Sequence, residues 1–142
     1  MTEAHIEALM PYEQEMFGTE AWTRNGYRSE LADRRNRYYI VVEGADSTLL
    51  GWAGVMMIGT TAEIHTVGVI PAARGRGLAR LMIDELLAEA KRRGGVEAFL
   101  EVRVDNTAAR ALYASEGFDE VGTRRGYYDA GRVDGVTMRR AL

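Results

Sequence analysis

A segment rich in glycine and arginine, Arg74–Ala79, has the residue types that most directly suggest ligand binding. It follows an apolar run that ends at Pro71 and precedes an amphipathic run, so it joins a predicted strand to a predicted helix. The first amides of a helix have no intrahelical acceptor and attract anions, and glycines let a phosphate approach the backbone closely. With the charge of Arg74 and Arg76, the segment suits a pyrophosphate group. A tight glycine turn without a ligand fits this segment alone equally well, because short glycine motifs are weak signals.

A single carboxylate, Glu101, lies within a predicted strand between the apolar residues Leu100 and Val102. A carboxylate in such a position is rarely buried without a partner. Glu101 is therefore either a paired structural charge or a functional group, and the strand pattern alone leaves both interpretations open.

Three further side chains have chemistry that suits a reactive site. Asn106 and Tyr113 are seven residues apart, so they share one face of a short predicted helix. Taken singly, Asn106 is better explained as a helix N-cap and Tyr113 as a core aromatic with a polar tip. Histidine side chains commonly exchange protons in enzymes, so His65 is a rival base to Glu101, unless it binds substrate or packs.

The hydrophobic pattern predicts the elements that must position these residues. Apolar residues at helical or alternating spacing, with turn residues between them, indicate ten elements. Helices are predicted at 6–17, 23–33, 78–92 and 107–115, and strands at 38–42, 49–58, 62–69, 98–104, 118–125 and 133–139. Pro11 must lie in the first turn of its helix or kink it. Helices alternate with strands, so we expect an α/β fold with a mixed, mostly antiparallel sheet covered by helices on both faces.

Composition limits the class of protein. The 142 residues predict one domain, 1–142, and a net charge of −3 gives no general reason to expect nucleic-acid binding. The absence of cysteine excludes disulfides and thiolate sites, and two histidines make a metal site improbable, so we expect no metal. The longest near-apolar run, 49–59, is far shorter than the roughly 20 residues that a membrane helix needs. We expect no membrane contact, a cytoplasmic location, and a monomer or weak dimer.

Together these segments resemble the GNAT superfamily of acetyltransferases. The family pattern Q/R-x-x-G-x-G/A is met by Arg74, Gly77 and Ala79, and the run LEVR is followed by Asn106 and Tyr113. Within the superfamily the chain resembles the RimI type, which acetylates the N-terminal alanine of a small-subunit ribosomal protein. The supporting segments are Ala21–Thr23, His65–Val69, the run LEVRVDN, Gly117–Phe118 and Arg124–Tyr128, and the likeness spans Trp22–Met138.

The resemblance implies a role for each matching residue. Glu101 would be the general base and Tyr113 the general acid, with acetyl-coenzyme A as co-substrate. An ordinary glutamate is a much weaker base than an amine, so burial or a relaying water would have to assist it. The acceptor would be flanked by Trp22, His65, Tyr127 and Tyr128, the last two in a loop. The cofactor would be held by Val67, Val69, Arg74, Gly75, Arg76, Gly77, Leu78, Ala79 and Asn106.

Two matters remain open at this level. Family members usually begin with a strand, but Met1–His5 leaves little room for one, so the first strand is missing or formed by Ala4–Met10. A lysine, a polyamine or an aminoglycoside is an alternative acceptor, and a non-catalytic acyl-coenzyme A sensor is the alternative outside enzymes. We also expect acidic residues near the entrance, Glu20 or Glu30, to attract a basic ribosomal tail.

Overall fold

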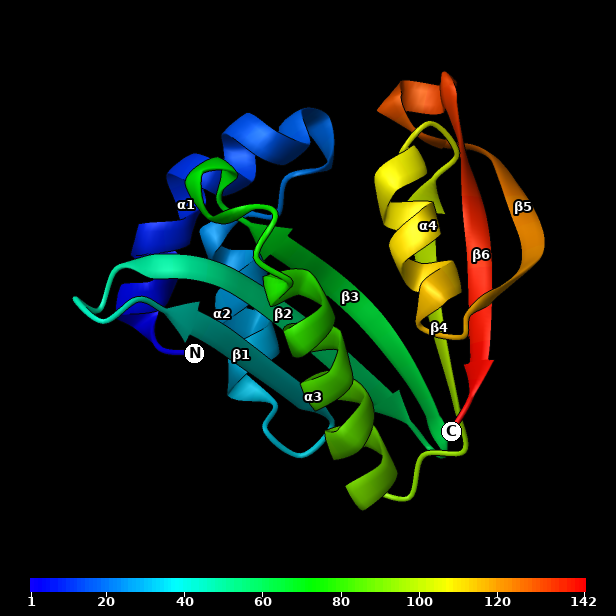
Figure 1. Cartoon of the computed structure of the whole chain (residues 1–142), viewed down its shortest axis with the longest axis horizontal. Coiled ribbons are helices and arrows are strands. Elements are labelled where there is room, and N and C mark those ends of the chain that lie inside the picture. Colours follow the sequence, from blue (N-terminus) through cyan, green and yellow to red (C-terminus); the bar gives the residue numbers. More distant parts are fainter.

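A computed structural model describes all residues, 1–142, and shows one six-stranded sheet flanked by helices (Figure 1). The strand order is β1-β2-β3-β4-β6-β5, and every neighbouring pair is antiparallel except β3 and β4. The order of helices and strands along the chain is the predicted one. The elements are α1 (Glu3–Phe17), α2 (Arg24–Ala32), β1 (Arg37–Glu43), β2 (Leu49–Ile58), β3 (Thr61–Val69), α3 (Leu78–Arg92), β4 (Glu97–Arg103), α4 (Thr107–Ser115), β5 (Asp119–Tyr128) and β6 (Val133–Ala141).

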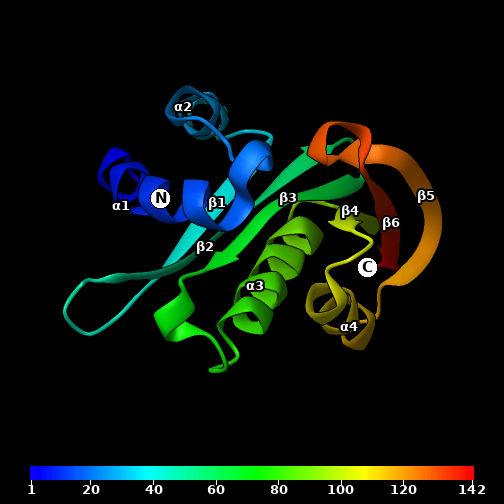
Figure 2. The ribbon, with the colours of Figure 1, turned by 90° about the horizontal axis from the view of Figure 1, so that it is seen from above.

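Helices cover both faces of the sheet, as predicted. Helices α1 and α2 lie on one face, and α3 and α4 lie on the other (Figure 2). Two hydrophobic cores result, because successive side chains of a strand point to opposite faces. In β2, for example, Trp52 packs in the core under α1 and α2, whereas Ala53 and Val55 pack in the core under α3. None of the helices is long and apolar enough to cross a membrane.

The N-terminal segment is helical. Thr2 caps α1, its hydroxyl accepting the His5 amide, and Ala4–Met10 lie inside the helix with Ile6 and Leu9 fully buried. The alternative in which Ala4–Met10 forms a strand is therefore wrong. Pro11 lies in the middle of α1, so the first of the two alternatives, a place in the first turn, is excluded. Burial of the apolar face of α1 compensates for the backbone hydrogen bond that a proline cannot donate.

The feature that matters most for function is a divergence in the middle of the sheet. Strands β3 and β4 pair only where Thr61–Glu63 faces Glu97–Phe99. Beyond that point they separate, as Figure 1 shows, while β3 stays paired with β2 and β4 stays paired with β6. The inner edge of β3 from Ile64 to Val69 therefore has no partner strand, and the two halves of the sheet enclose a gap.

The C-terminal pair of strands is longer than predicted. Strand β5 extends to Tyr128, so Tyr127 and Tyr128 lie at the end of a strand, and the prediction that they belong to a loop is wrong. An irregularity between Arg124 and Tyr128, with Gly126 at φ +61°, bends this end of the strand. Such bulges redirect side chains locally, and both tyrosines line the gap between the halves of the sheet.

Candidate active site

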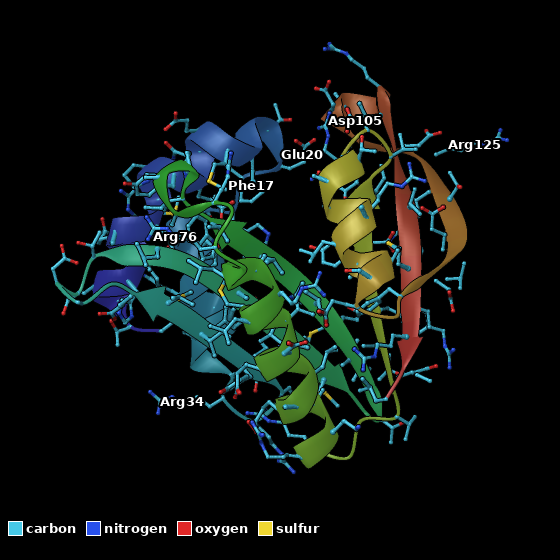
Figure 3. All side chains as sticks on the ribbon, viewed as in Figure 1. Phe17, Glu20, Arg34, Arg76, Asp105 and Arg125 are labelled. Atoms are coloured by element: carbon cyan, nitrogen blue, oxygen red, sulfur yellow. The ribbon has the colours of Figure 1, made fainter.

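A cavity of about 890 Å³ occupies the gap between the diverging strands β3 and β4. It brings together most of the predicted site residues, which come from β3, β4, β5, α4 with its N-cap, and the segment before α2. These residues are Trp22, His65, Val67, Glu101, Asn106, Tyr113, Tyr127 and Tyr128. Val69 and Arg74–Ala79 do not line it. Figure 3 shows Phe17 and Glu20, two further lining residues, at its α1 side.

Glu101 is both paired and directed toward the cavity. Its neighbours Leu100 and Val102 are buried in the core, so the alternation of β4 turns Glu101 to the opposite face. The Thr137 hydroxyl donates to Oε2 at 2.8 Å, and Arg124 Nη1 lies 3.5 Å from Oε1. A quarter of the side chain is exposed, so the carboxylate can still accept a proton from a molecule in the cavity.

Tyr113 lines the cavity from the side of α4. It projects from α4, its ring packs edge-on against Phe118 at 6.1 Å, and its hydroxyl makes no hydrogen bond within the chain. No unpaired side-chain oxygen or nitrogen is buried in the protein, so this hydroxyl is reached from the cavity. Burial raises the pKa of Tyr113 to about 12, which keeps the phenol protonated at neutral pH and available as an acid.

Asn106 is the N-cap of α4. Its Oδ1 accepts the Ala109 amide at 3.1 Å, whereas Asp105 pairs with Arg103. The interpretation of Asn106 as a helix N-cap is thus correct, and Oδ1 makes the capping hydrogen bond. The side-chain NH₂ group makes no hydrogen bond within the chain and remains free on the cavity wall.

Aromatic rings form the two walls of the cavity away from Tyr113. Trp22 lies 5.8 Å from the His65 ring on one side. On the other, Tyr127 and Tyr128 meet edge-on at 4.8 Å, each beneath a guanidinium group: Arg124 over Tyr127 and Arg103 over Tyr128. The walls are thus amphipathic surfaces that combine apolar rings with polar or charged groups.

Two buried carboxylates beside the cavity were not predicted as site residues. Glu30 is 8% exposed, beneath His65 rather than at the entrance, so its expected role in attracting a basic tail is wrong. Glu13 is 1% exposed and accepts a short hydrogen bond from the Tyr27 hydroxyl, and burial raises the pKa of Glu13. Both residues sit on the apolar faces of their helices, and a polar residue at an apolar position is the sequence signal that could have found them.

Glu20 lies at the mouth of the cavity. Its Oε1 accepts the Asp129 amide, which joins the segment after α1 to the turn between β5 and β6, and its Oε2 lies 3.5 Å from Arg103. These contacts partly neutralise the negative charge that Glu20, labelled in Figure 3, contributes to the cavity lining.

The glycine-rich segment has the geometry of an open helix N-terminus. Gly75 and Gly77 have φ of +80° and +76°, the left-handed region that favours glycine, and a Cβ at either position would meet nothing within 4 Å. Gly77 is the N-cap of α3 and supplies no side-chain acceptor, so the first amides of α3 are uncapped. The guanidinium groups of Arg74 and Arg76 reach only backbone carbonyls, at 3.4 Å each. Figure 3 shows Arg76 at this end of α3.

Comparison with known proteins places this geometry in a family. The model of the Acetyltransferase (GNAT) family matches residues 3–118. The chain is 43% identical to the N-alpha-acetyltransferase RimI of Mycobacterium tuberculosis, over 99% of this chain and 89% of that protein. It is 36% identical to the ribosomal protein bS18-alanine N-acetyltransferase of Salmonella typhimurium, over 76% of this chain and 74% of that one.

Solved structures show the same likeness. The crystal structure of the ribosomal-protein-S18-alanine N-acetyltransferase from Escherichia coli superposes with a TM-score of 0.86 and 25% identity. That comparison covers 100% of this chain and 90% of the other chain. The six-stranded mixed sheet and its flanking helices are therefore shared along the whole chain.

Proposed function

The chain belongs to the Acetyltransferase (GNAT) family of acyltransferases, and we propose that it acetylates the N-terminal α-amine of a protein. Acetyl-coenzyme A is the acetyl donor of this family. The observation that carries the proposal is one cavity in which the unpaired edge of β3 faces Glu101 and Tyr113. Residues 1–142 act as one domain in this proposal, since every helix packs on the same sheet.

The donor is held by the backbone more than by side chains. The free edge of β3 at Val67 and Val69 pairs with the amide groups of the pantetheine arm, as an added strand would. The uncapped amides at the start of α3 bind the pyrophosphate, and the left-handed Gly77 keeps them open. The free NH₂ group of Asn106 donates to the pantetheine arm from the opposite wall.

The transfer needs a base, an acid and an oxyanion site. The amine attacks the thioester carbonyl, and Glu101 accepts a proton from the attacking nitrogen, directly or through a water. Amides of the unpaired stretch of β3 stabilise the negative oxygen of the tetrahedral intermediate. Tyr113 then protonates the sulfur as the C–S bond breaks: its phenol is still protonated at neutral pH, so a proton is available where the thiolate, whose conjugate acid has a pKa of about 8.5, is released.

The acceptor is an N-terminal alanine of a small-subunit ribosomal protein, as the names of the Salmonella and Escherichia relatives indicate for those enzymes. Trp22 on one wall and the pair Tyr127 and Tyr128 on the other enclose a small side chain and leave the amine free to reach the thioester. An α-amine has a pKa of about 8 and a lysine of about 10.4, so at pH 7 the α-amine is about 250-fold more often neutral. A modest base such as Glu101 therefore suffices for the α-amine.

The test is mass spectrometry of a peptide that starts Ala-Arg and contains one internal lysine, incubated with acetyl-coenzyme A and the protein. We expect one acetyl group, on the α-amine. The matched control is the same peptide with its N-terminus already blocked, which should remain unmodified. Acetylation confined to the lysine in both peptides would overturn the proposal and favour the lysine acetyltransferase alternative.

A further inference from the structure

His65 is held by a buried carboxylate on one ring nitrogen only. Its Nδ1 lies 2.7 Å from Glu30 Oε1, and Glu30 is 8% exposed. The same carboxylate accepts the Tyr39 hydroxyl at 2.7 Å and pairs with Arg37. Although burial opposes ionisation, these hydrogen bonds hold the pKa of Glu30 below its ordinary value, so Glu30 is an anion. An anionic carboxylate only accepts hydrogen bonds, so Nδ1 carries the ring proton.

The other ring nitrogen is consequently an open acceptor on the cavity wall. His65 lines the cavity beside Trp22, and Nε2 has no hydrogen-bond donor within the chain. Glu63 Oε2 lies 3.5 Å from Nε2, which is too long for a hydrogen bond. The other charged residues lining the cavity are Glu13, Glu20, Glu101, Arg103 and Arg124.

The chemistry of the proposed function requires two protons to leave the attacking nitrogen. The acceptor enters mostly as an ammonium ion, since an α-amine has a pKa of about 8. It loses one proton to become nucleophilic and a second as the amide forms, whereas only one proton goes to the sulfur. Glu101 on β4 accounts for one of these transfers, and His65 lies across the cavity on β3.

We propose that His65 Nε2 accepts the first proton from the acceptor ammonium, and that Glu30 is the positioning residue that fixes His65 in the Nδ1–H form. The neutral amine then forms the C–N bond, its second proton passes to Glu101, the C–S bond breaks, and Tyr113 protonates the sulfur. The Glu101 proton returns to Tyr113 through solvent, and His65 releases its own, so each turnover releases one proton. This inference rests on the proposed function and names the residues that prepare its acceptor.

The tautomer is measurable directly, because the chain has only two histidines. His5 is an internal control with the opposite tautomer. Its Nδ1 accepts a hydrogen bond from the Thr2 amide at 2.9 Å, so its ring proton lies on Nε2, toward Glu43. Ring nitrogen NMR of protein labelled with ¹⁵N-histidine, above the titration of both rings, should show one ring of each form. H5Q assigns the two. Finding His65 in the Nε2–H form would overturn the proposal.

Kinetic measurements test the role of His65 as a base. Glu63, the carboxylate near Nε2, is the matched control for Glu30, the carboxylate at Nδ1. In acetylation of the Ala-Arg peptide, H65Q should lower kcat by about 100-fold, the low end for a general acid or base, with the larger loss at low pH. E30Q should give a mixed His65 tautomer and a smaller loss of kcat, and E63Q should change kcat by less than about threefold. Full kcat in H65Q, or equal losses in E30Q and E63Q, would refute the inference.

Further measurements distinguish a loss of proton transfer from a loss of folding, of coenzyme A binding or of the proposed acceptor. The melting temperature and the coenzyme A affinity should be unchanged in H65Q. If E30Q does not fold, the kcat of H65Q and the His65 tautomer of the wild-type protein still test the proposal. If the wild-type protein acetylates only the lysine of the test peptide, the proposed acceptor is wrong. The same variants are then compared on the lysine, so failure of the acceptor assignment is distinguished from failure of the Glu30–His65 assignment.

Discussion

The left-handed Gly77 at the start of α3 provides the sharpest test of how the donor is bound. Gly77→Val places a β-branched residue at φ +76°, where the Cβ itself would meet nothing within 4 Å, so the change acts through the backbone. Left-handed backbone costs a residue with a Cβ about 1–2 kcal/mol. If the loop of the variant relaxes when it is empty, it must return to the left-handed conformation to bind coenzyme A, and the binding free energy is weakened by this cost. Since 1.36 kcal/mol corresponds to tenfold, the affinity falls by about 5- to 30-fold.

Gly94→Val is the matched control, because Gly94 has φ +87°, equally open surroundings, and a place at the other end of α3. It should destabilise the protein similarly and leave the affinity unchanged. Arg76→Ala should weaken binding by less than about fivefold, since an exposed ionic contact contributes about 0.2–1 kcal/mol. Calorimetry with coenzyme A at fixed ionic strength gives all three affinities. Normal affinity in a folded Gly77→Val protein, with a larger loss in Arg76→Ala, would show that side-chain charge rather than backbone amides holds the pyrophosphate.

Three other changes test the chemistry and the buried charges. Tyr113→Phe should leave coenzyme A affinity intact and lower kcat by about 10²- to 10⁴-fold, and wild-type turnover in stopped-flow thiol detection would exclude it as the acid. Glu101→Gln should lower kcat most at low pH, so a flat ratio to wild type across pH 6 to 9 contradicts its role as base. Burial raises the pKa of Glu13 in the folded protein above its pKa in the unfolded chain. The contribution of Glu13 to the stability of the wild type is therefore largest below the pKa of the unfolded chain and is lost as pH rises through the pKa of the folded protein. In urea denaturation, the free energy of unfolding of Glu13→Gln should therefore rise relative to that of the wild type from pH 4 to pH 7. A constant difference between the two proteins would mean that Glu13 does not titrate in this range.

Local signals in the sequence were enough to predict most of the elements. Helix α3 was predicted with its observed bounds, because its apolar residues repeat at helical spacing and Gly94 follows its end. Asn106 caps the helix that it was expected to cap. Capping and periodicity involve residues three or four positions apart, so they can be recognised without knowing the rest of the fold.

The family resemblance identified residues that the fold brings to one cavity, but it did not define how each is held. Glu101 and Tyr113 are far from His65 in the chain, and their common cavity exists only because β3 and β4 separate beyond three paired positions. The length of a parallel pairing depends on contacts between distant segments, and no local pattern in either strand reports it.

Tertiary structure also decided what the polar residues do. Glu30 looked like an exposed acid, and the fold buries it against Tyr39, Arg37 and His65. Tyr127 and Tyr128 looked like loop residues, and pairing with β6 makes them the end of a strand. The sequence by itself determined the elements and the residue types available for acetyl transfer. Which nitrogen of His65 is free and which carboxylate is buried depend on long-range packing, because a side chain's charge and hydrogen bonds are set by neighbours that only folding supplies.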